Sequence, residues 1–123
     1  GGMNQRASIV RALVHDPDVL LMDEPFGALD AMTRDQMGLD FHLLSREEGK
    51  TVVFITHSIS EAVFLSNRVV IMSPRPGRVR EILDIDLPKE RHFELREESE
   101  FSRYVRHIRQ QFEMMGVLKE GRS

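Results

Sequence analysis

Hydrophobic residues along the chain gather in short continuous runs, separated by segments of helical spacing. The runs are Val19 to Met22, Thr51 to Ile55 and Val69 to Met72. Short apolar runs of this kind are typical of strands that are buried on both faces of a parallel sheet. Because helical patterns lie between them, the order predicts an α/β fold with crossover helices and a mostly parallel sheet.

Capping residues set the limits of the predicted helices. A first helix spans 3–15 and stops ahead of Pro17, since the residue before a proline avoids the helical region. Asp30 is suited to cap the N-terminus of a second helix over 31–48, and Gly49 is suited to end it.

The C-terminal part of the chain predicts three further kinds of element. Ser58 or Ser60 can cap a short helix. The alternating pattern from Val79 to Leu87 predicts an edge strand that pairs with the strand before it. Residues 88–100 are highly charged and are predicted to form a surface loop. Residues 101–115 carry apolar side chains along one helical face and predict an amphipathic helix.

Composition limits the classes of function. The 123 residues are 41% hydrophobic and 30% charged, which is typical of one modest globular domain. The net charge of −3 argues against nucleic acid as the main partner, and the absence of cysteine excludes disulfides and thiolate metal sites. No apolar run approaches the roughly 20 residues that span a bilayer. We interpret Arg103, Arg106 and Arg109 as the solvated face of the last helix rather than a membrane-binding surface.

Two adjacent carboxylates and a histidine follow strands that are expected to be neighbours. Asp23 and Glu24 end the first strand, and His57 ends the second. Open α/β sheets bind ligands at the carboxyl ends of their strands, so the three side chains are expected over one crevice. There, one carboxylate can hold a metal while its neighbour positions or activates a water molecule. The alternatives are a surface acidic pair that begins a loop, and a histidine satisfied in the core.

The tripeptide Gly49-Lys50-Thr51 matches the end of a phosphate-binding GxxxxGK[ST] loop, but we do not interpret it as one. Leu44 stands at the first glycine position. Such a loop joins a strand to a following helix, whereas here a predicted helix precedes and a strand follows. The other histidines show no ligand spacing and are interpreted as surface or packing residues: His15, His42, His92 and His107.

Four motifs, in order, resemble the second half of the nucleotide-binding domain of ABC transporters. They match the tail of the signature motif at Gly1 to Arg6, the Walker B motif at Asp23-Glu24, the D-loop at Gly27 to Asp30 and the switch histidine at Thr56-His57. The resemblance covers the chain as far as about Gly77. It implies a partial P-loop NTPase fold of three layers that lacks the Walker A half, and hence a C-terminal fragment that starts inside the signature motif.

The resemblance also implies roles in ATP hydrolysis for three residues. Asp23 is expected to hold Mg²⁺, and Glu24 to polarise the water that attacks ATP. His57 is expected to contact the γ-phosphate and to hold the catalytic geometry. Phosphoryl transfer of this kind depends mainly on positioning and charge stabilisation.

Other residues are implied to act across a head-to-tail dimer. Gly1 and Gly2 precede a helix, whose N-terminal N–H groups make an anion site, and are expected to meet ATP bound to a second ATPase subunit. Asp30 is expected in a loop at the dimer interface, a role compatible with capping the next helix. The alternative for the two glycines is a remnant of cloning. Met3 departs from the glutamine that many members carry.

The stretches Asp23 to Asp30 and Arg68 to Arg78 resemble the nitrate/sulfonate/taurine branch of importers. The branch implies an ATPase subunit at the cytoplasmic face of the cell membrane, bound to membrane-spanning permease subunits that transport a small nutrient. Residues 1–87 are then the C-terminal half of the ATPase core. Residues 88–123 are a charged loop and an amphipathic C-terminal helix.

Two other functions stay open from the sequence. An ABC-type ATPase can act on DNA or ribosomes, although the acidic net charge argues against this. The chain can also be a non-catalytic fragment or interaction module, since it contains no complete GxxxxGK[ST] loop. We expect the isolated chain neither to bind ATP tightly nor to hydrolyse it, and to self-associate through an uncovered part of its sheet.

Overall fold

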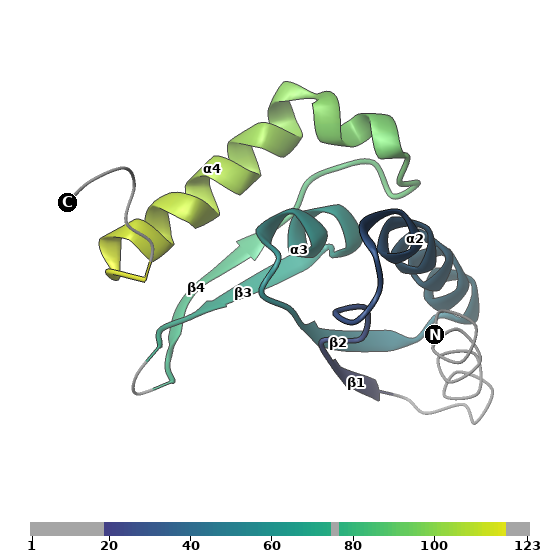
Figure 1. The fold of residues 1–123 in the computed structure, drawn as a ribbon, viewed down its shortest axis with the longest axis horizontal. Coiled ribbons are helices and arrows are strands. Elements are labelled where there is room, and N and C mark those ends of the chain that lie inside the picture. The colour runs from purple at the N-terminus through teal and green to yellow at the C-terminus, as the bar shows by residue number, and fades with distance from the viewer. Residues whose placement is uncertain (1–18, 75–76, 118–123) are drawn as a thin grey trace. The chain divides into compact units, whose positions relative to one another are not determined.

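The computed structural model describes residues 19–74 and 77–117 of the chain (Figure 1). They form two compact units, which divide between His57 and Ser58. Each unit combines helices with strands, so the predicted α/β class is confirmed at this level. The helix predicted over 3–15 lies outside the described residues. No helix in the described ranges is long and apolar enough to cross a membrane.

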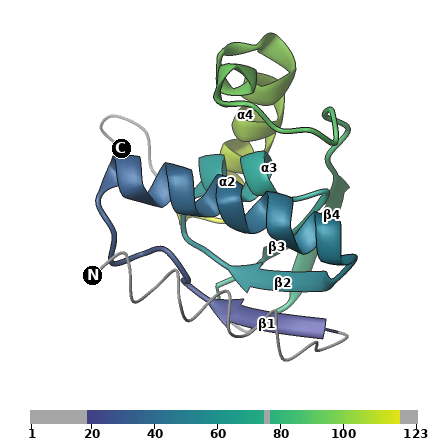
Figure 2. The ribbon, with the colours of Figure 1, turned by 90° about the vertical axis from the view of Figure 1, so that its right-hand side faces the viewer.

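The first unit contains a parallel strand pair joined by a helix (Figure 2). Strand β1 (Val19–Asp23) lies beside β2 (Thr51–Ile55), with Val19 opposite Thr51 and Asp23 opposite Ile55. Helix α2 (Ala31–Glu48) connects the two strands. The predicted limits of this helix and of the second strand are confirmed, and the first strand is one residue longer than predicted.

Local hydrogen bonds explain where α2 begins and ends. The Asp30 carboxylate accepts hydrogen bonds from the Thr33 backbone N–H at 2.9 Å and from the Thr33 hydroxyl at 3.1 Å. Gly49 adopts a φ of 66°, a left-handed conformation that suits glycine, and ends the helix. Because Lys50 lies between a helix and a following strand, this segment has the opposite topology to a phosphate-binding loop, as predicted.

One face of strands β1 and β2 is exposed, which corrects the prediction of burial on both faces and agrees with the expectation that part of the sheet is uncovered. Val19, Leu21, Val53 and Ile55 are 59%, 68%, 49% and 48% exposed, whereas the alternate apolar residues are half-buried. Residues at i and i+2 share a face of a strand, so these four side chains form one exposed apolar face. An apolar run reports the preference of its side chains, but not how many faces other elements cover.

The second unit has a helix, a strand pair and a second helical segment. Helix α3 (Ile59–Leu65) begins at Ser58, whose hydroxyl accepts a hydrogen bond from the Glu61 N–H. The following elements are β3 (Arg68–Met72), β4 (Val79–Asp84), the 3₁₀ helix η1 (Phe93–Glu97) and α4 (Ser99–Met114). The amphipathic C-terminal helix is thus confirmed.

The third strand pairs with the strand that follows it, as the alternating pattern from Val79 predicts. In the described part of the chain, β3 pairs antiparallel with β4 and forms a separate two-stranded sheet. A short connection closes this hairpin, and the Ser73 N–H donates to the Arg78 carbonyl at 2.7 Å. Antiparallel strands can be joined by so short a connection, whereas parallel strands need a longer crossover.

An aromatic cluster forms the core of the second unit. Phe64 of α3 stacks on Phe93, with ring centroids 5.8 Å apart, and meets Phe101 of α4 edge-on at 6.5 Å. Phe64, Phe101 and Ile108 are all buried. These contacts bury one face of α4, which explains why its apolar residues recur at helical spacing.

The charged segment after β4 is more than a surface loop, which corrects the prediction for 88–100. Leu87, Arg91 and Leu95 are buried. The Arg91 guanidinium donates hydrogen bonds to the carbonyls of Phe64 and Ser66, at 3.0 and 2.9 Å, and to the carbonyl of Leu87 at 3.2 Å. The bonds to Phe64 and Ser66 satisfy carbonyls at the end of α3, where no intrahelical donor is available. Arginine is counted as polar in sequence patterns, so this anchor is not visible there.

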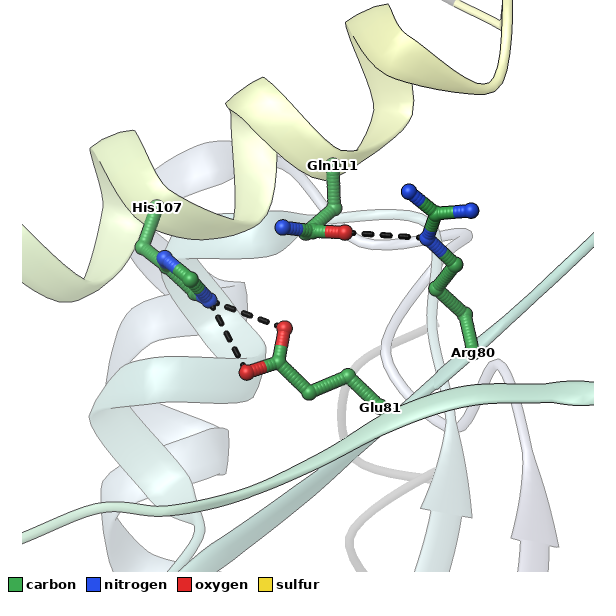
Figure 3. Close-up of polar contacts among 4 residues, drawn as sticks. All are labelled: Arg80, Glu81, His107 and Gln111. Atoms are coloured by element: carbon green, nitrogen blue, oxygen red, sulfur yellow. Dashed lines mark hydrogen bonds and ion pairs between the residues drawn. The ribbon is translucent and has the colours of Figure 1, made fainter.

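Side-chain pairs join α4 to β4 (Figure 3). The His107 Nε2 atom lies 2.8 and 3.0 Å from the two carboxylate oxygens of Glu81. The Arg80 Nε–H donates to Gln111 Oε1 at 3.0 Å. His107, which the sequence presents only as a surface or packing residue, therefore also links the helix to the strand.

Candidate active site

The carboxyl ends of β1 and β2 bring Glu24 and His57 together within the first unit. The Glu24 N–H donates to the Ile55 carbonyl at 2.8 Å, which continues the parallel ladder one residue beyond β1. Glu24 therefore lies beside the residues that directly follow β2. The two strand ends therefore lie side by side, as predicted.

The Glu24 carboxylate is held by the backbone of His57. Its Oε1 atom accepts a hydrogen bond from the His57 N–H at 2.9 Å, while the His57 Nε2 atom lies 3.5 Å from the same oxygen. The histidine side chain is 93% exposed and the glutamate side chain 34%. The backbone bond thus orients the carboxylate, and the imidazole is left accessible to a ligand.

Glu24 has an uncommon backbone conformation. Its φ is 48°, and it is the one non-glycine residue with positive φ among the described residues. Holding a residue with a side chain in this region costs about 1–3 kcal/mol, and such residues cluster at functional sites. The turn after Glu24 redirects the chain away from the strand, so that its carboxylate points back to His57.

The segment Glu24 to Asp30, which we call the acidic loop, is tightly folded on itself. The Gly27 N–H donates to the Glu24 carbonyl at 3.3 Å. A Cβ atom at Gly27 would lie 3.2 Å from Glu24 Oε2, so the absence of a side chain there leaves room for the carboxylate. Phe26 is 1% exposed and packs edge-on against Phe41 of α2, with ring centroids 6.1 Å apart. Burial of Phe26 anchors the middle of the acidic loop to the helix.

Asp30 ends the acidic loop as the N-cap of α2. The Thr33 N–H that bonds to its carboxylate lowers the pKa of Asp30 below the ordinary value of 3.8, and the Thr33 hydroxyl adds to this shift. Asp30 is exposed. The structure thus gives it the capping role, and its predicted role at a dimer interface stays a prediction.

The donor groups at the end of β1 fit Mg²⁺. Asp23 is exposed at the carboxyl end of the strand and directly precedes Glu24. In the described residues, no three acidic, histidine or cysteine side chains gather into a metal site. Mg²⁺ needs no such cage, since it keeps several waters and is commonly bound by one or two carboxylates together with substrate phosphates.

The structure therefore gathers part of the predicted site. Asp23, Glu24 and His57 lie at adjacent strand ends, while Gly1 and Gly2 lie outside the described residues. Sequence reasoning did not identify Arg34, whose guanidinium contacts the acidic loop. The only feature of the sequence that could have indicated Arg34 is its position one turn after the helix cap Asp30.

Comparison with known proteins gives close relatives but no match to a protein-family model. The chain is 53% identical, over 91 residues, to an uncharacterized ABC transporter ATP-binding protein of Methanocaldococcus jannaschii, covering 74% of this chain and 34% of the relative. It is 43% identical, over 119 residues, to the aliphatic sulfonates import ATP-binding protein of Bacillus cereus, covering 97% of this chain and 46% of the relative.

The homologues of this chain are therefore ABC transporter ATP-binding proteins. The chain spans only part of the length of these two relatives, 34% of the first and 46% of the second. These relatives therefore support the resemblance to ABC-transporter nucleotide-binding domains that the motifs indicate.

Proposed function

We propose that this chain is part of the ATP-hydrolysing subunit of an ABC importer. The observation that carries the proposal is the pairing of Glu24 with His57 at the ends of adjacent parallel strands. In this view the first unit belongs to a P-loop NTPase fold of three layers, whose phosphate-binding Walker A half is supplied by the rest of a longer subunit. The ATP-binding names of its homologues support the same reading.

Each of the three residues at the strand ends has a separate proposed role in ATP hydrolysis. Asp23 would hold Mg²⁺, which, when bound, neutralises charge on the phosphate oxygens. The Glu24 carboxylate orients and polarises a water molecule, whose oxygen bonds to the γ-phosphorus while the bond to the bridging oxygen breaks, giving ADP and phosphate. The exposed His57 imidazole is available to contact the γ-phosphate. General-base groups of this kind contribute about 10²–10⁴ in rate.

The proposed assembly is a head-to-tail dimer of ATPase subunits. Gly1 and Gly2 would contact ATP bound to the second subunit, and Asp30 would lie at the interface between them. Closure of the dimer would drive permease subunits from the cytoplasmic face of the membrane.

The transported molecule is proposed to be a small nutrient of the nitrate, sulfonate or taurine kind. The support is the identity to the Bacillus cereus protein, whose name describes import of aliphatic sulfonates. Co-purification of permease subunits with the complete subunit tests the coupling to transport. Co-purification with DNA or ribosomes instead would contradict it.

A double-mutant cycle on ATP turnover tests the catalytic assignment. We would measure the complete subunit that carries this sequence as wild type, Glu24→Gln, His57→Ala and the double variant, with the exposed Glu48→Gln as a matched control. If Glu24 and His57 act as a unit, the two losses are not additive, and Glu48→Gln turns over ATP like the wild type. Independent additive losses, or none, would contradict the proposal.

A further inference from the structure

We propose that Arg34 is a positioning residue, which fixes the acidic loop and through it the Glu24 carboxylate. The inference rests on the proposed function for its catalytic consequence, but its structural part can be tested separately. Arg34 lies near the start of α2, about one turn after the N-cap Asp30. From there its side chain reaches back to the loop that precedes the helix.

The Arg34 guanidinium bonds to two successive peptide carbonyls. Its Nε–H donates to the Phe26 carbonyl at 3.2 Å, and its Nη2–H donates to the Gly27 carbonyl at 3.0 Å. The guanidinium is a rigid, planar group with donors in a fixed fork, so two simultaneous bonds fix the direction of both carbonyls. Lysine has a single point charge on a flexible stem and cannot reproduce this arrangement.

Gly27 transmits this constraint to Glu24. The residue whose carbonyl accepts from Arg34 also donates its N–H to the Glu24 carbonyl at 3.3 Å. The Cα of Gly27 lies so close to the glutamate side chain that an added Cβ would be 3.2 Å from Glu24 Oε2. A shift of the Gly27 peptide therefore changes both the backbone bond of Glu24 and the space for its carboxylate.

The loop needs such a constraint because side-chain packing holds only part of it. Burial of Phe26 fixes one position, while Gly27 has no side chain with which to pack. Glu24 itself sits in a left-handed conformation that is costly unless its surroundings enforce it. Arg34 supplies that enforcement at the point where packing cannot.

A positioning role differs from a general stabilising role in what it changes. Arg34 is only half-buried and bonds to carbonyls of a loop, so its loss is expected to affect that loop more than the whole unit. The diagnostic groups are the N–H of Gly27 and the N–H of His57, which bond to the carbonyl and the carboxylate of Glu24. Amides in the β1–β2 ladder report on general stability.

Amide hydrogen exchange of the 123-residue chain tests the structural part. In Arg34→Met, exchange at Gly27 and His57 should be faster by about tenfold, which corresponds to about 1.4 kcal/mol, while the β1–β2 ladder is unchanged. Arg34→Lys should give an intermediate increase, and it is the variant to use if Arg34→Met does not fold. The control is Arg46→Met in the last turn of the same helix, which should leave both amides unchanged. Unchanged exchange in Arg34→Met, or an equal rise throughout the ladder, would overturn the proposal.

ATP turnover of the complete subunit then separates the two proposals. We expect kcat of Arg34→Met to fall by up to about 10²-fold with KM for ATP little changed, since misplacement by about an ångström can cost that much. If Glu24→Gln abolishes turnover but Arg34→Met keeps the wild-type kcat, the positioning role is wrong and the proposed function stands. If turnover does not depend on Glu24, the proposed function fails, whatever the exchange data give for the loop.

Discussion

At the scale of single residues, strand ends place the candidate catalytic groups and backbone bonds orient them. The neighbourhood of Glu24 and His57 could be predicted, since both follow strands that pair in parallel. The bond from the His57 N–H to the Glu24 carboxylate could not, because it depends on the left-handed φ of Glu24. The bonds from Arg34 to the acidic loop could not be predicted either, because they depend on how the loop folds back toward α2.

The cap of α2 should lose strength in acid. The lowered pKa of Asp30 means that its carboxylate stabilises the folded state fully above the ordinary value of 3.8, and that this contribution is lost as pH falls through the lowered pKa. Titration of the Thr33 amide signal by NMR should give a midpoint below 3.8. Asp30→Asn keeps an acceptor and should remove this titration. A Thr33 midpoint at or above the ordinary value would contradict the account.

At the scale of elements, caps were more informative than apolar runs. Asp30 and Gly49 gave the limits of α2 because their hydrogen bonds are local and use nearby sequence. The segment after β4 was misread, since Arg91 is buried by bonds to carbonyls that lie more than twenty residues earlier. The link between His107 and Glu81 was missed for the same reason.

The contact between α4 and β4 should include a measurable coupling between His107 and Glu81. Both side chains are partly exposed, at 39% and 32%, so the pair should contribute only about 0.2–1 kcal/mol to the free energy of unfolding. Urea unfolding of Glu81→Gln, His107→Leu and the double variant gives this coupling energy. Arg103→Met, on the exposed side of α4, is the control. Strictly additive losses would show that the pair does not hold the helix.

At the scale of the whole molecule, the α/β class and both strand pairs could be predicted from the sequence. The described strands form one parallel pair, β1 with β2, and one antiparallel pair, β3 with β4. The exposure of one face of β1 and β2 could not be read from the apolar runs, because it depends on which segments cover the sheet. The predicted domain boundary after residue 87 stays a prediction.

The isolated chain should self-associate through its exposed apolar face. Leu21 and Val53 lie opposite each other on this face of β1 and β2, and both are largely exposed. Contiguous apolar surface of this kind favours association. Sedimentation velocity over a range of concentrations should show oligomers, which Leu21→Lys reduces. Met32→Lys, at an apolar side chain on α2 that is 84% exposed, is the matched control and should have little effect. A monodisperse wild-type monomer would count against this expectation.

A single-turnover experiment tests most directly whether Glu24 activates water for ATP hydrolysis. The complete subunit, as wild type and as Glu24→Gln, would be mixed with Mg-ATP, and bound nucleotide and released phosphate would be measured in the same sample. We predict that Glu24→Gln retains ATP but releases phosphate about 10²–10⁴ times more slowly. Phosphate release at the wild-type rate would show that Glu24 is not the catalytic carboxylate.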